Sequence, residues 1–328
     1  MKILIVKLSS LGDVVHAMPA VQDIRRALPQ AQIDWVVERS FAPLVQRCAG
    51  VRRVIPCELR RWRKAPFAAT TRAEWKRFKA ELQREAYDAV IDLQGLSKSA
   101  LVAWLARLAA GGKRYALANR TDGSAYEAPT RWVADVAIRL EPHVHAVRRS
   151  RELCARALAY SVPAQERFGL QPHSTASAPA SARPCVALVH GSSRADKLWP
   201  FAYWVELARR LDAAGFDVAL LHGSDAEQGR SEAMAREMAH ARVWPRLALD
   251  ALTDTLAGCA GVIGVDSGLS HIAVALDLPH VQIYNFETAW RTGPVGRERQ
   301  CSVYARPTPT VDAVWQAWLV VSHESEAA

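Results

Sequence analysis

The chain has few cysteines and none of them are closely paired. Its six cysteines stand far apart, and none belongs to a Cys-x-x-Cys pair. Zinc cages and disulfide frameworks need cysteines at characteristic spacings, so the sequence argues against both. His143 and His145 have no cysteine or carboxylate cluster beside them, so we expect packing or hydrogen bonding from these two rings. The sequence therefore predicts buried free thiols and no metal site.

An apolar run long enough to cross a bilayer is also missing. The longest run, residues 100–110, is interrupted by Arg107 and falls well short of the roughly 20 residues of a membrane helix. The opening MKILIVK leads straight into a strand-like segment and carries no small-residue cleavage site. With 328 residues, half of them apolar, the chain can bury two cores of ordinary size. We expect a folded protein in the cytoplasm.

The first turn lacks the glycines of common nucleotide-binding turns. Neither G-x-G-x-x-G nor G-x-x-x-x-G-K-[ST] follows the apolar residues 3–6. The sequence there is KLSSLGD, which allows a turn at Gly12 and places the carboxylate of Asp13 on it. Open α/β folds bind ligands at the carboxyl ends of their parallel strands, so Asp13 faces a candidate site. On spacing alone, a helix cap and a chemical role for Asp13 are equally supported.

Charge is unevenly distributed along the chain. Residues 1–170 hold 29 Lys and Arg against 16 Asp and Glu, whereas the remainder holds 13 against 17. A basic half fits an anionic partner such as a nucleic acid, an anionic membrane or an acidic substrate. The motif signatures of nucleic-acid-binding modules are absent, so we expect no nucleic acid partner.

Strand-like and helix-length segments alternate twice. Short apolar runs occur at residues 2–6, 33–37, 54–56 and 89–92, and again at 185–189, 217–221, 261–265 and 281–284. Between the two series lies a Ser-, Ala- and Pro-rich stretch that is typical of a linker. The alternation predicts an α/β fold of two Rossmann-like domains with parallel sheets. We expect an N-terminal domain at 1–165, a linker at 166–184, a C-terminal domain at 185–310, and a last helix with a tail at 311–328.

The second series contains a cluster suited to a diphosphate. GVIGVDSGLSH places Asp266, Ser267, Gly268 and His271 where a strand turns into a helix, and amides at a helix start bind phosphate. A plain strand-turn-helix cap is the simpler alternative. Candidate ligands from two further turns are Ser192, Ser193 and Lys197 for the diphosphate, and Glu227 for ribose hydroxyls.

A basic run in the first half surrounds one tryptophan. LRRWRKAP contains Arg60, Arg61, Arg63 and Lys64 around Trp62. On composition alone, such a run is more often a solvated face than a binding site.

Five motifs in order carry a family resemblance: KLSSLGDVVHAMPA, RRWRKA, VIDLQGLSKSA, ADKLWP and VDSGLSH. Together they resemble the bacterial lipopolysaccharide heptosyltransferases, a family of ADP-heptose-using glycosyltransferases. The resemblance implies the GT-B architecture, in which two Rossmann-like domains face each other across a cleft and the last helix packs back on the N-terminal domain. It also implies inverting, metal-independent transfer, without a cofactor, from ADP-L-glycero-β-D-manno-heptose to the first Kdo of Kdo2-lipid A.

Residue roles follow from the same resemblance. Asp13 is the implied catalytic base, and Lys197 the implied catalytic cation at the leaving diphosphate. The donor set is Ser9, Ser10, Gly12, Ser192, Ser193, Lys197, Glu227, Asp266, Ser267, Gly268 and His271. The acceptor set is Arg60, Arg61, Arg63, Lys64, Lys98 and Arg120. We further expect a monomer that associates transiently with the anionic cytoplasmic face of the inner membrane.

One segment departs from the family pattern. Relatives carry a Gly-Pro-Thr-type loop after the tyrosine that corresponds to Tyr284, and here Asn285, Phe286 and Glu287 intervene. Donor choice is therefore less defined than the chemistry. The alternatives are a sister activity of the same family, another ADP-sugar transferase, a non-enzymatic module that binds anions or nucleic acid, or a nucleotide-binding regulatory protein without catalysis. The last could dispense with Asp13, which is present in its full motif.

Overall fold

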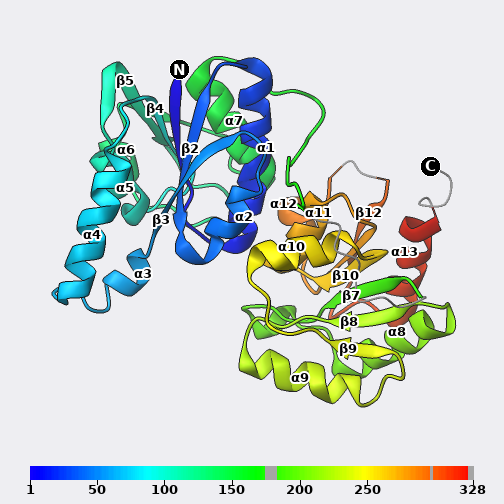
Figure 1. Ribbon diagram of the computed structural model, residues 1–328. Helices are drawn as coiled ribbons and strands as arrows, with labels where there is room; N and C mark the ends of the chain where they lie inside the picture. The colour runs from blue at the N-terminus through cyan, green and yellow to red at the C-terminus, as the bar shows by residue number, and fades with distance from the viewer. Residues whose placement is uncertain (174–182, 296–297, 324–328) are drawn as a thin grey trace. The chain divides into compact units, whose positions relative to one another are not determined.

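The computed structural model describes residues 1–173, 183–295 and 298–323 (Figure 1). The chain divides into two compact units, Met1–Gln171 and Pro172–Ala328. The division falls inside the predicted linker at 166–184, of which residues 174–182 lie outside the described part. None of the helices in the described residues is long and apolar enough to cross a membrane.

The N-terminal unit is built on a parallel six-stranded sheet of order β3-β2-β1-β4-β5-β6. Its central strands are buried on both faces, which explains their continuous apolar runs. The strands are β1 (Lys2–Val6), β2 (Gln32–Glu38), β3 (Val51–Cys57), β4 (Tyr87–Asp92), β5 (Leu108–Leu117) and β6 (Val136–Ile138).

Helices cover both faces of this sheet. Figure 1 shows α1 and α7 together on one side and α4 and α5 on the other. On the second side, Phe78 and Leu82 of α4 and Val102 of α5 share a core with Leu4 and Val6 of β1. The helices are α1 (Leu11–Ala27), η1 (Arg39–Phe41), α2 (Ala42–Gln46), α3 (Leu59–Trp62), α4 (Ala69–Leu82), α5 (Ser97–Leu105), α6 (Pro129–Val133) and α7 (Ala146–Leu158).

The C-terminal unit repeats the plan with the order β12-β11-β10-β7-β8-β9, again all parallel. Its strands are β7 (Cys185–Val189), β8 (Asp217–Leu220), β9 (Ala241–Val243), β10 (Gly261–Val265), β11 (His280–Tyr284) and β12 (Gln300–Tyr304). Its helices are η2 (Ala195–Lys197), α8 (Phe201–Ala213), α9 (Asp225–Ala235), α10 (Leu249–Ala257), α11 (Gly268–Ala275), α12 (Ala289–Thr292) and α13 (Val311–His323).

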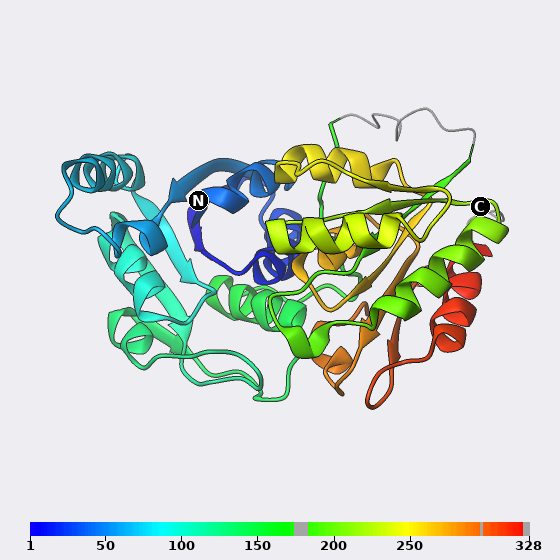
Figure 2. The same cartoon turned by 90° about the horizontal axis from the view of Figure 1, so that it is seen from below.

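The last helix packs on the sheet of its own unit. Its buried residues Val311, Val314, Trp318 and Val321 belong to the core of the C-terminal unit. Figure 2 shows α13, in red, alongside α8. A Cβ at Gly261 would lie 2.6 Å from the Trp318 ring, so the helix approaches β10 closely because glycine stands there. The apolar face of α13 is therefore used by its own domain.

Both sheets reverse their strand order at one point. In the N-terminal unit the chain builds β1, β2 and β3 in one direction and then places β4 on the other side of β1. The C-terminal unit does the same between β7 and β10. At such a reversal, the chain leaves one strand toward one face of the sheet and leaves the neighbouring strand toward the other face. The two connections therefore separate and open a crevice at the carboxyl ends of the strands, where such folds bind ligands. Each unit thus has one predicted binding edge.

Candidate functional site

Asp13 lies at the binding edge of the N-terminal unit, in the first turn of α1. Its Oδ2 accepts hydrogen bonds from the Ser10 backbone N–H at 3.1 Å and the Ser10 hydroxyl at 2.8 Å. The helix-cap interpretation is therefore confirmed. The second oxygen, Oδ1, lies 3.5 Å from Lys7 Nζ and 3.7 Å from Arg149 Nη2. About a third of the side chain is exposed. Gly12 lies in the same helical turn without a positive φ, so the sharp bend expected there is absent.

The charges around Asp13 keep it ionised. Burial raises the pKa of Asp13, but Lys7, the hydrogen bonds from Ser10 and the charge of Arg149 outweigh burial and hold the pKa well below its usual range. Burial lowers the pKa of the fully enclosed Lys7, and the neighbouring Asp13 opposes that shift. A carboxylate that stays ionised at neutral pH is available to accept a proton.

Sequence reasoning missed Lys7 and Arg149. Arg149 comes from α7, and its buried guanidinium also donates to the Thr121 hydroxyl at 3.2 Å. A further bond from Arg149 reaches Ser124 in the loop after β5. In the sequence, Arg149 stands in VRRSRE, where nothing distinguishes it from its neighbours. The signal is tertiary, because it depends on the packing of α7 against α1.

Ser9, near Asp13 at the binding edge of the N-terminal unit, contacts two of the predicted acceptor-binding residues. Its buried hydroxyl accepts hydrogen bonds from Arg60 Nη2 and Lys98 Nζ, each at 3.1 Å. Lys98 is held by the turn after β4, in which Asp92 accepts bonds from two backbone amides and from the Ser99 hydroxyl. Burial, followed by the charge of Arg60, lowers the pKa of Lys98. The structure therefore brings Arg60 and Lys98 together at Ser9, which lies four residues before Asp13 in the chain.

The other predicted acceptor residues have different surroundings. Arg61 is paired with Glu58 at 2.8 Å and with Glu74, so its guanidinium joins α3 to α4 and is not brought to Ser9. Arg63 lines a cavity together with Lys98, and Lys64 is exposed. Arg120 is exposed in the loop after β5 and donates to the Ser124 carbonyl at 3.2 Å.

Asp266 organises the binding edge of the C-terminal unit. Its Oδ2 lies 2.6 Å from Lys197 Nζ, and its Oδ1 lies 3.4 Å from His271 Nε2 and 3.5 Å from Thr292 Oγ1. Burial raises the pKa of Asp266, but His271 and Lys197 outweigh it and hold the pKa well below its usual range. A carboxylate repels a diphosphate, so we infer that Asp266 positions the side chains of Lys197 and His271 rather than binding the diphosphate itself.

The start of α11 offers polar groups next to Lys197. Ser267 is the N-cap residue, and its buried hydroxyl oxygen has no hydrogen-bond partner among the described residues. Gly268 follows as the first helical residue. Ser192 donates to the Asp266 carbonyl at 3.3 Å, whereas Ser193 is exposed. Amides at this helix start and the Lys197 ammonium suit an anionic group.

Glu227 lies against the turn that follows β7. A Cβ at Gly191 would lie 2.4 Å from Glu227 Oε1, so the absence of a side chain at residue 191 leaves room for the carboxylate in this position. Its Oε2 accepts the Gly223 amide at 2.6 Å. Glu227 is therefore held at the same sheet edge as Lys197.

The residues after Tyr284 that differ from the family pattern support the loop that carries Lys197. Asn285 Nδ2 donates to the carbonyls of Asp196 at 2.9 Å and Leu198 at 3.0 Å. The exposed ring of Phe286 lies 6.0 Å from the Arg194 guanidinium. The segment thus holds η2, and the sequence could not show this because the partners lie far apart along the chain.

Replacing Asp266 with Asn is expected to lower the free energy of unfolding at pH 7 by about 1–3 kcal/mol, because charged hydrogen bonds to Lys197 and His271 are lost. Since the folded pKa of Asp266 is depressed, its stabilisation is present above the unfolded pKa of about 4 and is lost as pH falls toward the folded value. The difference between wild type and variant should therefore shrink below about pH 4. Urea unfolding from about pH 7 to pH 3 measures it, and a pH-independent difference contradicts the assignment.

Comparison with known proteins places the chain in a family. A family model described as glycosyltransferase family 9 (heptosyltransferase) matches residues 75–315. The lipopolysaccharide heptosyltransferase 1 of Escherichia coli (strain K12) is 40% identical over 289 residues, which cover 87% of this chain and 88% of that protein. The lipopolysaccharide heptosyltransferase 2 of the same strain is 26% identical over 318 residues, covering 91% and 86%.

A solved structure of the E. coli heptosyltransferase WaaC with ADP superposes with a TM-score of 0.86 at 35% identity, and the match covers 100% of both chains. The predicted α/β fold with two parallel sheets, and its match to the GT-B heptosyltransferases, are thus confirmed. The chain belongs to glycosyltransferase family 9, the heptosyltransferases, and is an enzyme of sugar transfer.

Proposed function

We propose that the protein transfers L-glycero-D-manno-heptose from ADP-L-glycero-β-D-manno-heptose to the first Kdo of Kdo2-lipid A, a step of lipopolysaccharide inner-core synthesis. The observation that carries the proposal is the ionised Asp13, held by Lys7, Ser10 and Arg149 at a sheet edge beside Arg60 and Lys98. The identity of 40% to a heptosyltransferase 1, against 26% to a heptosyltransferase 2, favours the first Kdo over the sister acceptor.

In this proposal, the acceptor hydroxyl oxygen attacks the anomeric carbon while the bond from that carbon to ADP breaks on the opposite side, which inverts the configuration. Asp13 accepts the hydroxyl proton. Its lowered pKa keeps it ionised at neutral pH but makes it a weak base, so the proton moves as the new carbon–oxygen bond forms and the hydroxyl becomes acidic.

In this proposal, the C-terminal unit stabilises the negative charge that develops on the leaving ADP. Lys197, the α11 amides at Ser267 and Gly268, and the free hydroxyl of Ser267 would stabilise the diphosphate. Asp266 positions Lys197 and His271, and Glu227 would bind the ribose. Ser192 and Ser193 complete the donor set in this unit.

The acceptor carries carboxylates on Kdo and phosphates on lipid A, which suit guanidinium and ammonium groups. Arg60 and Lys98 are the best placed, because Ser9 holds both beside the Asp13 turn. Arg63, Lys64 and Arg120 would add contacts, whereas Arg61 supports the α3–α4 junction through Glu58 and Glu74. Ser9, Ser10 and Gly12 would be the donor-binding residues that this unit contributes.

The test is to incubate the purified full chain with ADP-heptose and Kdo2-lipid A and to weigh the lipid product by mass spectrometry. We expect one added heptose and stoichiometric ADP. A parallel reaction uses a lipid that already carries the first heptose. Addition only to that second lipid would support the sister activity, and addition to neither would overturn the proposal.

We further propose that the enzyme works as a monomer on the anionic cytoplasmic face of the inner membrane. Each basic residue near an anionic surface contributes about 1 kcal/mol, so three or four of them support transient rather than permanent binding. Because this attraction is screened, high salt should weaken it.

A further inference from the structure

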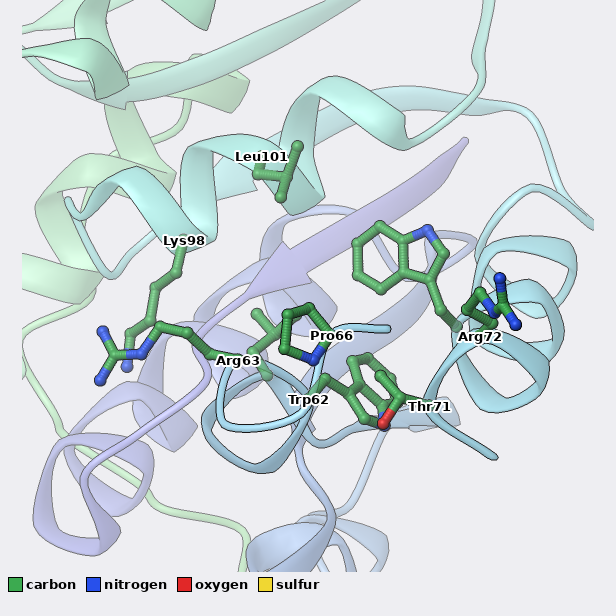
Figure 3. A pocket seen from close by; sticks show the side chains of 9 residues that line it. Trp62, Arg63, Pro66, Thr71, Arg72, Lys98 and Leu101 are labelled. Atoms are coloured by element: carbon green, nitrogen blue, oxygen red, sulfur yellow. The ribbon is translucent and has the colours of Figure 1, made fainter. Parts of the chain in front are cut away.

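A cavity of about 460 Å³ opens between α3, α4 and α5 of the N-terminal unit. Its volume lies within the range of small-ligand pockets. Apolar side chains form most of its wall, namely Leu59, Trp62, Pro66, Trp75 and Leu101 (Figure 3). None of these residues has a role in the proposed transfer, so the cavity requires a separate explanation.

Two indoles, those of Trp62 and Trp75, line the cavity. Trp62 and Trp75 pack edge to face with ring centroids 5.6 Å apart. The polar atom of Trp62 is already used, because its Nε1 donates to Glu74 at 2.7 Å. Because most of the wall is apolar and the Trp62 N–H is already bonded, the cavity fits an aliphatic chain better than a polar ligand.

Three cationic side chains line the same cavity. Figure 3 shows Arg63 and Lys98 side by side at one end and Arg72 at the other. No carboxylate lines the cavity in the described part of the chain. An apolar wall with a wholly cationic set of charges complements an amphiphile that has an anionic head and a hydrocarbon tail.

Apolar surface continues beyond the cavity. Leu101 is 42% exposed, and Trp104, one turn further along α5, is 60% exposed. Phe67, next to Pro66 in the loop after α3, is 86% exposed. One bound chain could not cover all of this surface, whereas the interfacial region of a bilayer could, and aromatic side chains favour that region.

We propose that the cavity between α3, α4 and α5 takes an acyl chain of an anionic membrane phospholipid, with Arg63, Arg72 and Lys98 at its headgroup and with Phe67 and Trp104 inserted beside it. The inference deepens the proposed function, on which its biological meaning rests, by naming the membrane-docking surface. Lys98 links the two sites, since it lines the cavity and also bonds Ser9 at the Asp13 edge.

The first experiment measures binding of the full chain to vesicles of phosphatidylglycerol with phosphatidylcholine. Leu101→Asp places a charge on the exposed cavity wall and should weaken partitioning by about tenfold or more. Val320→Asp, at an exposed apolar position on α13 of the other unit, is the matched control and should bind as the wild type does. Unchanged binding of Leu101→Asp overturns the proposal.

A second measurement tests whether the acyl chain of the lipid lies in the cavity. Phosphatidylglycerol with brominated acyl chains quenches indoles that it contacts, so part of the wild-type quenching should disappear in Trp75→Phe. Trp315→Phe, which removes another half-buried indole from α13, should lose none of the quenching. Equal quenching in the two variants overturns the assignment.

Two further experiments distinguish failure of the phospholipid proposal from failure of the proposed function. If only vesicles that contain Kdo2-lipid A bind, the cavity takes a chain of the acceptor itself and the phospholipid proposal is wrong. Heptose transfer to a deacylated, water-soluble Kdo2-lipid A backbone should be the same in Leu101→Asp and wild type. Absence of transfer by the wild type to intact Kdo2-lipid A, in the reaction described above, overturns the proposed function whatever the vesicles show.

Discussion

Asp13→Asn is expected to lower kcat by about 10²- to 10⁴-fold, which is the usual contribution of a positioned general base. Asparagine keeps an oxygen that can accept the Ser10 backbone amide but cannot take a proton from the acceptor. Initial rates with saturating ADP-heptose and Kdo2-lipid A measure the effect. The change in stability should stay near 1 kcal/mol, because the cap is weakened rather than removed.

The control separates capping from catalysis. The Thr310 hydroxyl accepts the Ala313 amide at 3.2 Å at the start of α13. Thr310→Ala should therefore lower stability by about 1 kcal/mol and leave kcat near the wild-type value. If Asp13→Asn folds and turns over at a rate close to wild type, Asp13 is a cap only, and the mechanism above is wrong.

Lys197→Ala should lower kcat by about 10²- to 10³-fold, similar to the loss of one preorganised group that stabilises developing charge. The reason is that the ammonium, held 2.6 Å from Asp266, would meet the diphosphate as its charge grows. ADP affinity, measured by calorimetry, should fall much less than kcat. A wild-type rate in the variant would exclude the role.

Removing Lys197 also leaves the buried Asp266 carboxylate without its ammonium partner, so a second cause of inactivity must be tested. The double variant Lys197→Ala with Asp266→Asn removes that buried charge. If the loss of rate came only from an unpaired carboxylate, the double variant would regain activity. We expect no recovery. Lys113→Ala, at an exposed lysine on β5 of the other unit, serves as the surface control and should retain full activity.

Parts of the fold could be predicted closely because they are buried. The apolar runs at 185–189 and 261–265 coincide with β7 and β10, whose residues are almost all buried. Strands β5, β6, β9 and β12 were not predicted. The last three are edge strands, which are only partly buried and show no continuous apolar run. β5 lies inside the sheet, but its first eight residues are half-buried or exposed and include two glycines and two basic residues, so it shows no continuous apolar run either. The strand-turn-helix motifs likewise predict that Asp13 and Asp266 lie at sheet edges, because an apolar strand ends just ahead of each of these residues.

The basic residues show where such prediction ends. Arg60 and Arg61 are neighbours with the same chemistry, yet Arg60 reaches Ser9 whereas Arg61 is held by Glu58 and Glu74. Their spacing could not separate them, because a long flexible side chain takes whichever partner the fold brings within reach. For the same reason, the sequence did not single out Arg149, which stands among similar residues in the helix α7.

By itself, the sequence determined the two α/β domains and the fact that Asp13, Lys197 and Asp266 follow the carboxyl ends of strands. Apolar periodicity and turn residues are local properties, and burial forces them to match the strands and helices. The tertiary structure alone decided which charges meet, that α13 packs on its own sheet, and that an apolar cavity opens between α3, α4 and α5. Those outcomes depend on distances between residues far apart in the chain, which only packing sets.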